Sequence, residues 1–214
     1  MKNYFYLIFT IFIITACNNK HKEKTAKETD IITKTSTIKK VETKEKNDTK
    51  FIVKKVIPKE YTFTFEDLEK HSTTLHIKND LYHFSNIKQP IVMVFFFATW
   101  CPTCIGQIPH LSSLQKKFKK NLFILSSLVY DDCSNKKLNK FLIAQKVAFF
   151  TSSRQKENLK FANFITPKLG LTKDFPMPLM ILFVNGKYFT HYEGMMPEEM
   201  IESDIKQVLQ KITP

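Results

Sequence analysis

Cys101 and Cys104 are separated by two residues, and this spacing in a chain of 214 residues points to three kinds of chemistry. A C-x-x-C sequence can form a redox-active pair, half of a zinc site or a small structural loop. Zinc would need two further ligands, but the sequence has no second C-x-x-C, and His110 would lie on a different helix face from Cys104. Zinc is therefore disfavoured, which leaves a redox pair or a structural loop.

The segments on either side predict how the cysteines are positioned. Residues 91–97 (IVMVFFF) are an unbroken run of β-branched and aromatic side chains, typical of a strand buried on both faces. Pro102 suits the first position of a helix, and Pro109 is predicted to kink that helix. Cys101 is therefore expected where the strand turns into the helix. The helix presents an apolar face formed by Ile105, Ile108, Leu111, Leu114 and Phe118.

The start of a helix favours a reactive thiolate. Its unpaired N–H groups and positive dipole end stabilise negative charge on Cys101 and lower its pKa toward the working pH. Cys104, one turn later, is expected to be sheltered and to attack the mixed disulfide that Cys101 forms. Together these two steps are thiol–disulfide exchange.

Four features of the wider sequence occur together: VMVFFFATWCPTC at 92–104, Pro109, FPMPLMILFVNGK at 175–187, and Tyr192-Glu193-Gly194 before a predicted last helix. With them, residues 60–212 resemble the thioredoxin superfamily, and within it the exported TlpA/ResA/CcmG group. The resemblance implies an α/β thioredoxin fold. This fold has a central mixed β-sheet flanked by helices, with an N-terminal β-hairpin extension and an inserted strand and helix.

The resemblance also implies roles for individual residues, with Cys101 as the attacking cysteine and Cys104 as the resolving one. Pro178 matches the cis-proline beside the disulfide, and Met177 would offer backbone groups to an extended substrate segment. Trp100 would shield the active site. The alternatives are an ordinary turn proline at 178 and a half-buried packing role for Trp100. The residues expected to contact substrate are Trp100, Pro102, Thr103, Met177 and Pro178.

Two positions depart from the family pattern. Thioredoxin has a buried Asp, and TlpA-like proteins often an Asn, where this chain has Phe95; many TlpA-like helices have Glu where it has Gln107. Without a buried acid, deprotonation of Cys104 lacks its usual proton acceptor. A carboxylate of the predicted hairpin would have to replace it, the candidates being Glu66, Asp67 and Glu69.

Cys133 lies in a loop after a predicted strand, Leu122–Leu128, and directly follows Asp131 and Asp132. The two acids are expected to raise its pKa and make it a poor nucleophile. We expect an unreactive thiol; the alternative is a third redox partner or a regulatory site.

The N-terminus has the pattern of a secretory signal, in which Lys2 precedes an apolar run over residues 4–14. The run is too short to span a bilayer, which takes about 20 apolar residues. It leads into Ile14-Thr15-Ala16-Cys17, which resembles a bacterial lipobox, where the cysteine is lipidated and becomes the mature N-terminus. We predict a signal peptide over residues 1–16 and a lipid on Cys17. The alternatives are an ordinary cleaved signal and an uncleaved anchor.

Residues 17–57 contain 12 lysines, six acidic residues and no aromatic residue before Phe51. Such a segment buries too little apolar surface to fold alone, so we predict a disordered Lys/Thr/Glu-rich tether. The alternative is that its lysines bind anionic lipid headgroups. Residues 58–214 are predicted to form one thioredoxin-like domain.

Composition excludes two further classes of function. The net charge is +13, but about half of the excess lies outside the predicted domain. Arg154 is the only arginine, whereas specific nucleic-acid readers rely on bidentate guanidinium groups, so we expect no nucleic-acid partner. Four scattered glycines cannot form a dinucleotide fingerprint or a phosphate loop.

The remaining segments alternate between strand and helix, as an α/β layer structure requires. The predicted elements are a helix with Leu138, Phe141 and Leu142, a strand Val147–Phe150, a helix with Leu159, Ala162 and Ile165, and a hairpin of Leu179–Val184 and Lys187–Tyr192 closed by Asn185-Gly186. Pro197, Glu198 and Glu199 open a final helix, whose apolar face consists of Ile201, Ile205, Val208, Leu209 and Ile212.

These observations predict a thiol:disulfide oxidoreductase that is lipid-anchored in the bacterial cell envelope and faces the periplasm. The resemblance to the TlpA/ResA/CcmG group implies a dithiol reductase of proteins with cysteines or disulfides, apocytochrome c among them, that is supplied by a membrane electron donor of the thiol-reductase type. Its only redox group would be the Cys101–Cys104 disulfide, with no metal and no other cofactor. The alternatives are a DsbA-like oxidase or isomerase, and a non-catalytic thioredoxin-fold module that binds a metal, haem or a partner protein.

Overall fold

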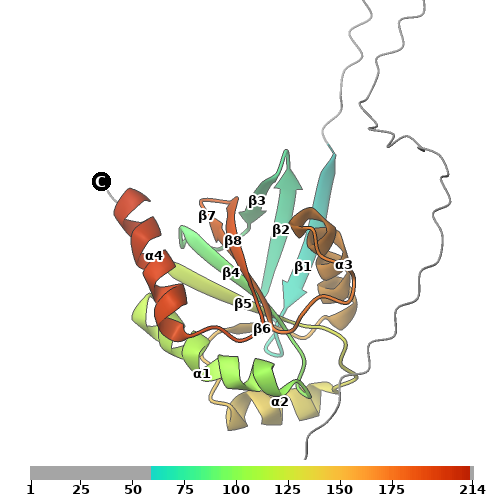
Figure 1. Cartoon of the computed structure of the whole chain (residues 1–214). Helices are drawn as coiled ribbons and strands as arrows, with labels where there is room; N and C mark the ends of the chain where they lie inside the picture. The colour runs from blue at the N-terminus through green and yellow to red at the C-terminus, as the bar shows by residue number, and fades with distance from the viewer. Residues whose placement is uncertain (1–58, 213–214) are drawn as a thin grey trace, which may run out of the picture. The chain divides into compact units, whose positions relative to one another are not determined.

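The computed structural model describes residues 59–212 (Figure 1). The predicted signal peptide over residues 1–16, the lipid site at Cys17 and the tether over residues 17–57 lie outside the described residues and stay predictions. Within residues 59–212, no helix is both long enough and apolar enough to cross a membrane.

A five-stranded mixed sheet forms the centre of the domain, in the order β6-β5-β4-β7-β8. Strand β4 runs parallel to β5, and β5 runs parallel to β6, whereas β7 is antiparallel to both β4 and β8. The central strand β4 is buried along its whole length, as its continuous apolar sequence predicts. The bounds are β4 Ile91–Phe97, β5 Leu122–Leu128, β6 Phe150–Ser152, β7 Leu179–Val184 and β8 Lys187–Glu193.

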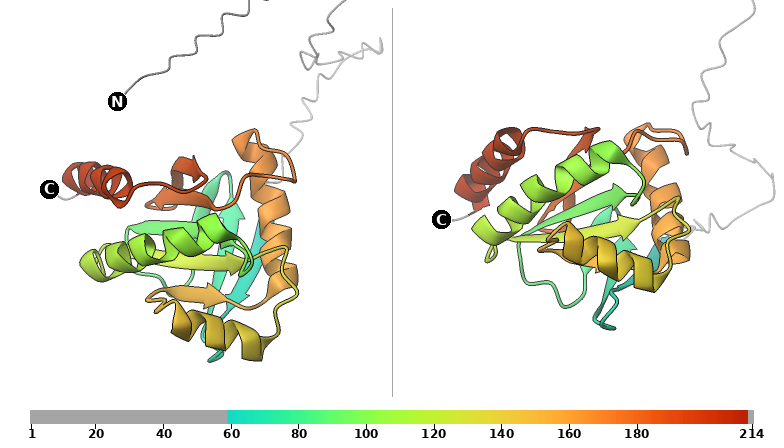
Figure 2. Two further views of the ribbon diagram at one scale, coloured as in Figure 1. Left: turned by 60° about the horizontal axis from the view of Figure 1, so that its bottom comes forward. Right: turned by 90° about the horizontal axis from the view of Figure 1, so that it is seen from below.

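Three helices cover one face of this sheet: α1 (Pro102–Lys117), α2 (Asn135–Ala144) and α4 (Glu198–Ile212) (Figure 2). The odd-numbered residues of β4 point into this core, where they meet the apolar side of α1. Six of the apolar side chains predicted from helical spacing are buried there: Ile108, Leu111 and Leu114 from α1, and Ile201, Ile205 and Val208 from α4. The other predicted members of these faces are only partly buried, namely Ile105, Phe118, Leu209 and Ile212.

The other face is covered by α3 (Gln155–Ile165), which continues into a short 3-10 helix (Thr166–Leu169), and by a separate three-stranded antiparallel sheet. The even-numbered residues of β4 point into this second core. Phe161 of α3 packs among aromatic side chains from both sheets, namely Phe63, Phe65 and Phe96. Among residues 59–212, the side chains that form the two cores run from Phe63 to Ile212.

The predicted N-terminal hairpin is present as β1 (Glu60–Glu66) and β2 (Ser72–Lys78), and β3 (Leu81–Phe84) extends it to three strands. This sheet is linked to the β7–β8 turn, where the Tyr82 amide donates to the Gly186 carbonyl at 2.7 Å. Gly186 has φ +75°, and a Cβ there would lie 2.8 Å from the Tyr82 carbonyl oxygen. The predicted Asn185-Gly186 turn is confirmed, and the close approach of β3 explains the need for glycine.

The predicted inserted helix and strand are α2 and β6, but the strand lies later than expected. Residues Val147–Phe150 were predicted to form it, whereas pairing with β5 begins only at Phe150. The Val147 amide instead donates to Leu142 at the end of α2, and the Ala148 amide donates to Ser112 of α1. Because the amides of Val147 and Ala148 are bonded to groups of α2 and α1, they cannot donate to β5, and the strand starts later.

Candidate active site

Cys101 and Cys104 are joined by a disulfide at the start of α1, with their Cα atoms 5.2 Å apart. Cys101 is the N-terminal capping residue of the helix, and Pro102 occupies its first turn as predicted. The Cys104 amide donates to the Cys101 sulfur at 3.2 Å. Since this N–H has no partner within the helix, it stabilises negative charge on that sulfur once the disulfide is reduced.

The two cysteines differ in their access to solvent. The Cys101 side chain is 4% exposed, whereas Cys104 is completely buried in the core beneath α1. An external disulfide can therefore reach Cys101 first, and Cys104 is placed to attack from within the protein. This geometry agrees with the order of attack predicted from the sequence.

The turn between β4 and α1 is fixed by Asp131, from the loop after β5. One carboxylate oxygen of Asp131 accepts from the Thr99 amide at 2.5 Å and from the Thr99 hydroxyl at 2.7 Å. The other accepts from the Cys133 amide at 2.9 Å. Asp131 thus ties two loops together beside the disulfide. Sequence reasoning missed this role, although the adjacent ends of parallel strands β4 and β5 were a usable signal.

Met177 and Pro178 lie beside the start of α1, although more than 70 residues separate them from it in sequence. The peptide bond between them is cis, and Pro178 is buried. The Thr103 hydroxyl donates to the Met177 carbonyl oxygen at 3.1 Å and lies 3.3 Å from the Cys101 sulfur. The structure therefore brings together both cysteines and three of the predicted substrate-contacting residues.

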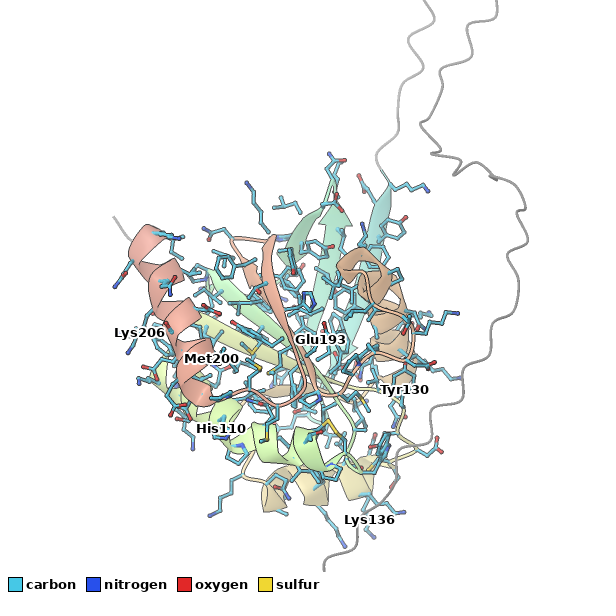
Figure 3. The ribbon with its side chains drawn as sticks, in the orientation of Figure 1. His110, Tyr130, Lys136, Glu193, Met200 and Lys206 are labelled. Atoms are coloured by element: carbon cyan, nitrogen blue, oxygen red, sulfur yellow. A yellow bond between two sulfur atoms is a disulfide. The ribbon has the colours of Figure 1, made fainter. Side chains whose placement is uncertain are left out.

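Trp100 is exposed rather than half-buried, with 60% of its surface accessible. Its indole N–H donates to the Tyr130 carbonyl oxygen at 2.8 Å, which holds the ring at the rim of the site. Tyr130, labelled in Figure 3, is itself 41% exposed, and its hydroxyl donates to the Lys173 carbonyl oxygen. Pro102 is also exposed at the start of α1.

Met195 is a second apolar side chain that sequence reasoning missed. It is 55% exposed, and its sulfur lies 3.0 Å from the position that a Cβ on Gly106 would take. Gly106 therefore lets Met195 lie directly on the second turn of α1. Exposed aromatic and methionine side chains of this kind are typical of protein-binding surfaces. Trp100, Tyr130 and Met195 give the surroundings of the disulfide an apolar surface.

Gln107 and Phe95, the two positions at which the sequence departs from the family pattern, are both fully buried. The Gln107 side-chain carbonyl accepts from the Met196 amide at 2.8 Å, and its NH₂ group has no partner among residues 59–212. Phe95 stacks on Phe97, with ring centroids 5.3 Å apart. No Asp or Glu side chain is buried anywhere in residues 59–212.

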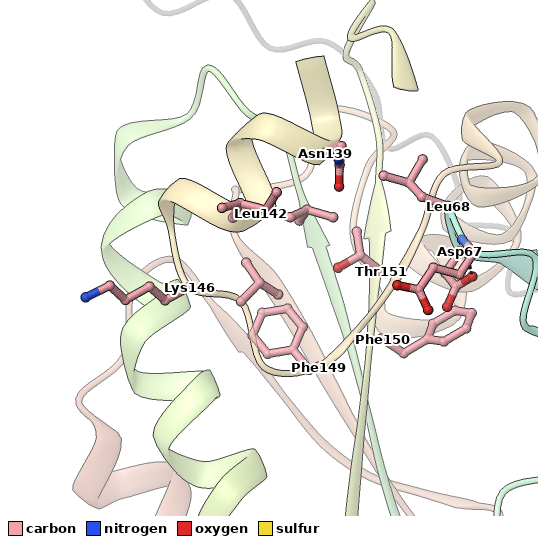
Figure 4. Close-up of a pocket in the computed structure, with 11 residues that line it drawn as sticks. Asp67, Leu68, Asn139, Leu142, Lys146, Phe149, Phe150 and Thr151 are labelled. Carbon is pink, nitrogen blue, oxygen red and sulfur yellow. Dashed lines mark hydrogen bonds between the residues drawn. The ribbon is translucent and has the colours of Figure 1, made fainter. Parts of the chain in front are cut away.

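The carboxylates of the N-terminal hairpin do not replace the missing buried acid. Asp67 accepts from the His71 ring at 3.0 Å, and Glu66 pairs with Lys70 at 3.0 Å, within their own turn. Asp67 and Glu69 line a cavity of about 320 Å³ between that turn, α2 and β6 (Figure 4). These carboxylates are thus exposed or partly exposed groups that interact within the hairpin turn or line the cavity. Among residues 59–212, Cys104 therefore has no buried carboxylate to accept its proton.

Cys133 is a half-buried free thiol whose pKa is raised, first by burial and second by the negative charge of Asp131. The Thr99 side chain and the positive charge of Lys137 act in the opposite direction and lower this pKa. The predicted direction is confirmed, and of the two acids Asp131 is the one among its causes. Within the part of the chain that the structure describes, no three His, Cys, Asp or Glu side chains are grouped to hold a metal.

Comparison with known proteins gives a family and a set of similar folds. The Redoxin family profile matches residues 63–209. A thiol:disulfide interchange protein of the thioredoxin family from Chlorobium tepidum has a TM-score of 0.54 at 17% identity, over 69% of this chain and 93% of that one. The thioredoxin domain of a thiol-disulfide oxidoreductase from Bacteroides vulgatus has a TM-score of 0.51 at 19% identity, over 69% and 94% of the two chains.

A candidate thiol:disulfide interchange protein DsbE from Chlorobium tepidum has a TM-score of 0.51 at 23% identity, over 70% of this chain and 94% of that one. No curated protein matches this chain significantly. At these identities the solved structures establish the shared fold.

Asp131→Asn is expected to lower the pKa of Cys133, because a neutral amide removes the negative charge that disfavours the thiolate. In oxidised protein, Cys133 is the one free thiol of residues 58–214. The pH dependence of its alkylation by iodoacetamide therefore measures this change, and the midpoint should move to lower pH. Asp132→Asn is the matched control and should keep the wild-type midpoint. Equal midpoints in all three proteins would contradict the role of Asp131.

Proposed function

Because the chain belongs to the Redoxin family, has the thioredoxin fold and is a thiol:disulfide oxidoreductase, we propose that it acts as a dithiol reductase of protein disulfides, anchored by lipid in the bacterial cell envelope. The observation that carries this proposal is the Cys101–Cys104 disulfide at the N-terminus of α1, beside the exposed surface of Trp100 and the backbone of Met177. Its redox group is this disulfide alone.

In the reducing direction, the Cys101 thiolate attacks one sulfur of a substrate disulfide. A bond forms between Cys101 and that sulfur, and the other substrate sulfur leaves as a thiolate that takes up a proton. Cys104 then loses its proton and attacks the Cys101 sulfur, which releases the second substrate thiolate and closes the enzyme disulfide. The substrate gains two electrons and two protons. The enzyme gives up both electrons and the Cys104 proton, and the second proton comes from solvent, because Cys101 starts as a thiolate.

The site suits a protein substrate better than a small thiol. Met177 precedes Pro178 in an extended segment, and backbone groups of this kind pair with an added strand. Exposed apolar surface is added by Trp100 next to Cys101, by Tyr130 at the Trp100 ring and by Met195 on the second turn of α1. An extended polypeptide with a cysteine or disulfide can lie across this surface with its sulfur at Cys101. Apocytochrome c is a substrate of this description.

The enzyme must regain two electrons after each cycle, and we propose a membrane electron donor of the thiol-reductase type. Support for the reducing direction comes from the resemblance to the TlpA/ResA/CcmG group. One observation favours the opposite direction: the Cys104 amide at the Cys101 sulfur stabilises the thiolate and hence the reduced form. Stabilising the reduced form makes a dithiol a stronger oxidant, as in DsbA. An oxidase is therefore the second candidate.

The catalytic assignment is tested with insulin reduction by dithiothreitol, using residues 58–214. The wild type should accelerate the reaction, and Cys101→Ser should abolish the acceleration because no thiolate is left to attack. Cys104→Ser should accumulate mixed disulfides between Cys101 and substrate, since the second attack is lost. Cys133→Ser is the matched control and should keep the wild-type rate. Equal rates for wild type and Cys101→Ser would leave only the non-catalytic binding module.

The direction is tested by the reduction potential of the Cys101–Cys104 pair, measured in glutathione or dithiothreitol buffers with thiol alkylation. A reductase should have a potential closer to that of thioredoxin, about −270 mV, than to that of DsbA, about −120 mV. Cys133→Ser protein keeps the third thiol out of the measurement. A potential near that of DsbA would contradict the reductase and support a protein-thiol oxidase.

Lipid anchoring is tested by Cys17→Ser in the full chain, expressed in a bacterium with lipoprotein processing. The wild type should incorporate an alkyne-tagged fatty acid and stay with the membranes after a carbonate wash, because more than one acyl chain holds firmly. The variant should lose the label. Asn18→Ser, at the next position, is the control and should stay labelled. Labelling of the Cys17→Ser variant would refute the lipid site.

A further inference from the structure

The Thr103 hydroxyl lies between two acceptors but has only one proton to donate. Its oxygen is 3.1 Å from the Met177 carbonyl oxygen and 3.3 Å from the Cys101 sulfur. A hydroxyl has one O–H donor, so it can satisfy either acceptor, but not both at once. Because both distances are within bonding range, the proton can change partner by rotation of the O–H bond alone.

The oxidation state of Cys101 decides which acceptor is better. In the disulfide, Cys101 carries no charge and its sulfur is a weak acceptor, so the carbonyl of Met177 receives the proton. In the dithiol state, Cys101 becomes a thiolate, and the Cys104 amide, which lies 3.2 Å from its sulfur in the disulfide state, is placed to donate to it. A hydrogen bond to a charged acceptor is roughly twice as strong as one between neutral groups. The thiolate therefore outcompetes the carbonyl.

We propose that Thr103 is a redox-dependent switch: its hydroxyl caps the Met177 carbonyl in the disulfide state, and turns to the Cys101 thiolate in the dithiol state. This inference rests on the proposed function and assigns a positioning role to the residue between the two cysteines. The switch itself transfers no electron. On reduction the pair gains two electrons from its donor and one proton on Cys104, since Cys101 stays a thiolate, and the hydroxyl only changes its acceptor.

The consequence concerns substrate affinity. The Met177 carbonyl is the acceptor that an added substrate strand would use, since it belongs to the extended segment beside the disulfide. In the dithiol state this carbonyl is free, and a polypeptide with an oxidised disulfide can pair with it. After the reaction the disulfide state restores the Thr103 hydrogen bond and competes with the reduced product. Thr103 thus helps a reductase to hold its substrate and to release its product.

The first test compares wild type, Thr103→Val and Thr103→Ser in a Cys133→Ser background of residues 58–214. Valine keeps the shape of threonine without the hydroxyl, and serine keeps the hydroxyl. In reduced protein, the pH midpoint of Cys101 alkylation should rise by about one unit in Thr103→Val, as expected for loss of a hydrogen bond to a charged group. Thr103→Ser should keep the wild-type midpoint. If valine disturbs folding, Thr103→Ala removes the same hydroxyl.

The second test measures binding of a nine-residue synthetic peptide of extended conformation, with serine in place of its cysteine so that no reaction occurs. Wild type and Thr103→Ser should bind it about two- to tenfold more tightly when reduced than when oxidised, which is the range for one net hydrogen bond. Thr103→Val should bind equally in both states. A redox-independent affinity in the wild type would overturn the switch, and so would an unchanged alkylation midpoint in Thr103→Val.

These readouts separate the switch from the proposed function. Neither requires turnover, whereas the proposed function fails if wild-type protein shows no Cys101-dependent reduction of insulin. A wild type that reduces insulin while Thr103→Val retains its alkylation midpoint and its redox-dependent affinity would leave the enzyme intact and remove the switch. A carbon-13 label on the Met177 carbonyl gives a direct check, because its resonance should shift on reduction in the wild type but not in Thr103→Val.

Discussion

Burial of β4 on both faces is the constraint on which the site depends. Its odd-numbered residues pack beneath α1 and α4, and its even-numbered residues pack against α3 and the N-terminal sheet. A slip of one residue would exchange these sets between two differently shaped cores, so the register is held from both sides. The strand therefore ends at Phe97, and α1 begins at Pro102. This leaves Cys101 where its sulfur meets a free N–H group of the helix.

The topology of the central sheet assembles the other groups at the same edge. Strands β4 and β5 are parallel, so Thr99 and Asp131 meet beyond their carboxyl ends. Strand β7 runs in the opposite direction, so its beginning brings Met177 and Pro178 to that edge. Strand β8 reverses again, and the Gly194 amide after it donates to the Pro178 carbonyl oxygen. Four connections thus supply one site.

Neutral hydrogen-bond donors, rather than charged side chains, stabilise negative charge at the Cys101 sulfur. The Cys104 amide and the Thr103 hydroxyl surround the Cys101 sulfur, and no Asp or Glu is buried in residues 59–212. Gln107 holds the chain after β8 through its carbonyl and offers only an NH₂ group to the interior. Donors of this kind stabilise a thiolate but cannot accept the proton of Cys104, which must leave toward solvent. Asp131 has a carboxylate beside this turn, but its two oxygens already accept hydrogen bonds from Thr99 and from the Cys133 amide.

Local patterns in the sequence determined the strands and helices, the C-x-x-C pair at the start of α1, and the Asn185-Gly186 turn. These features depend on near neighbours in the chain, whose burial and backbone preferences can be read directly. The resemblance to the thioredoxin superfamily supplied the rest of the topology. The late start of β6 was missed because the amides of Val147 and Ala148 are taken by the end of α2 and by Ser112, and strand propensity does not reveal competition for donors.

Only the tertiary structure decided which distant groups meet at the disulfide. Thr99 and Asp131 are 32 positions apart, Thr103 and Met177 are 74 apart, and Gln107 and Met196 are 89 apart. Tyr130 and Met195 join the surface around Trp100 in the same way, whereas Glu66, Asp67 and Glu69 are kept at the hairpin. Hydrogen bonds between such positions depend on strand order and direction, because these bring separate loops to one edge of the sheet. This proximity cannot be predicted from the spacing of the residues along the chain.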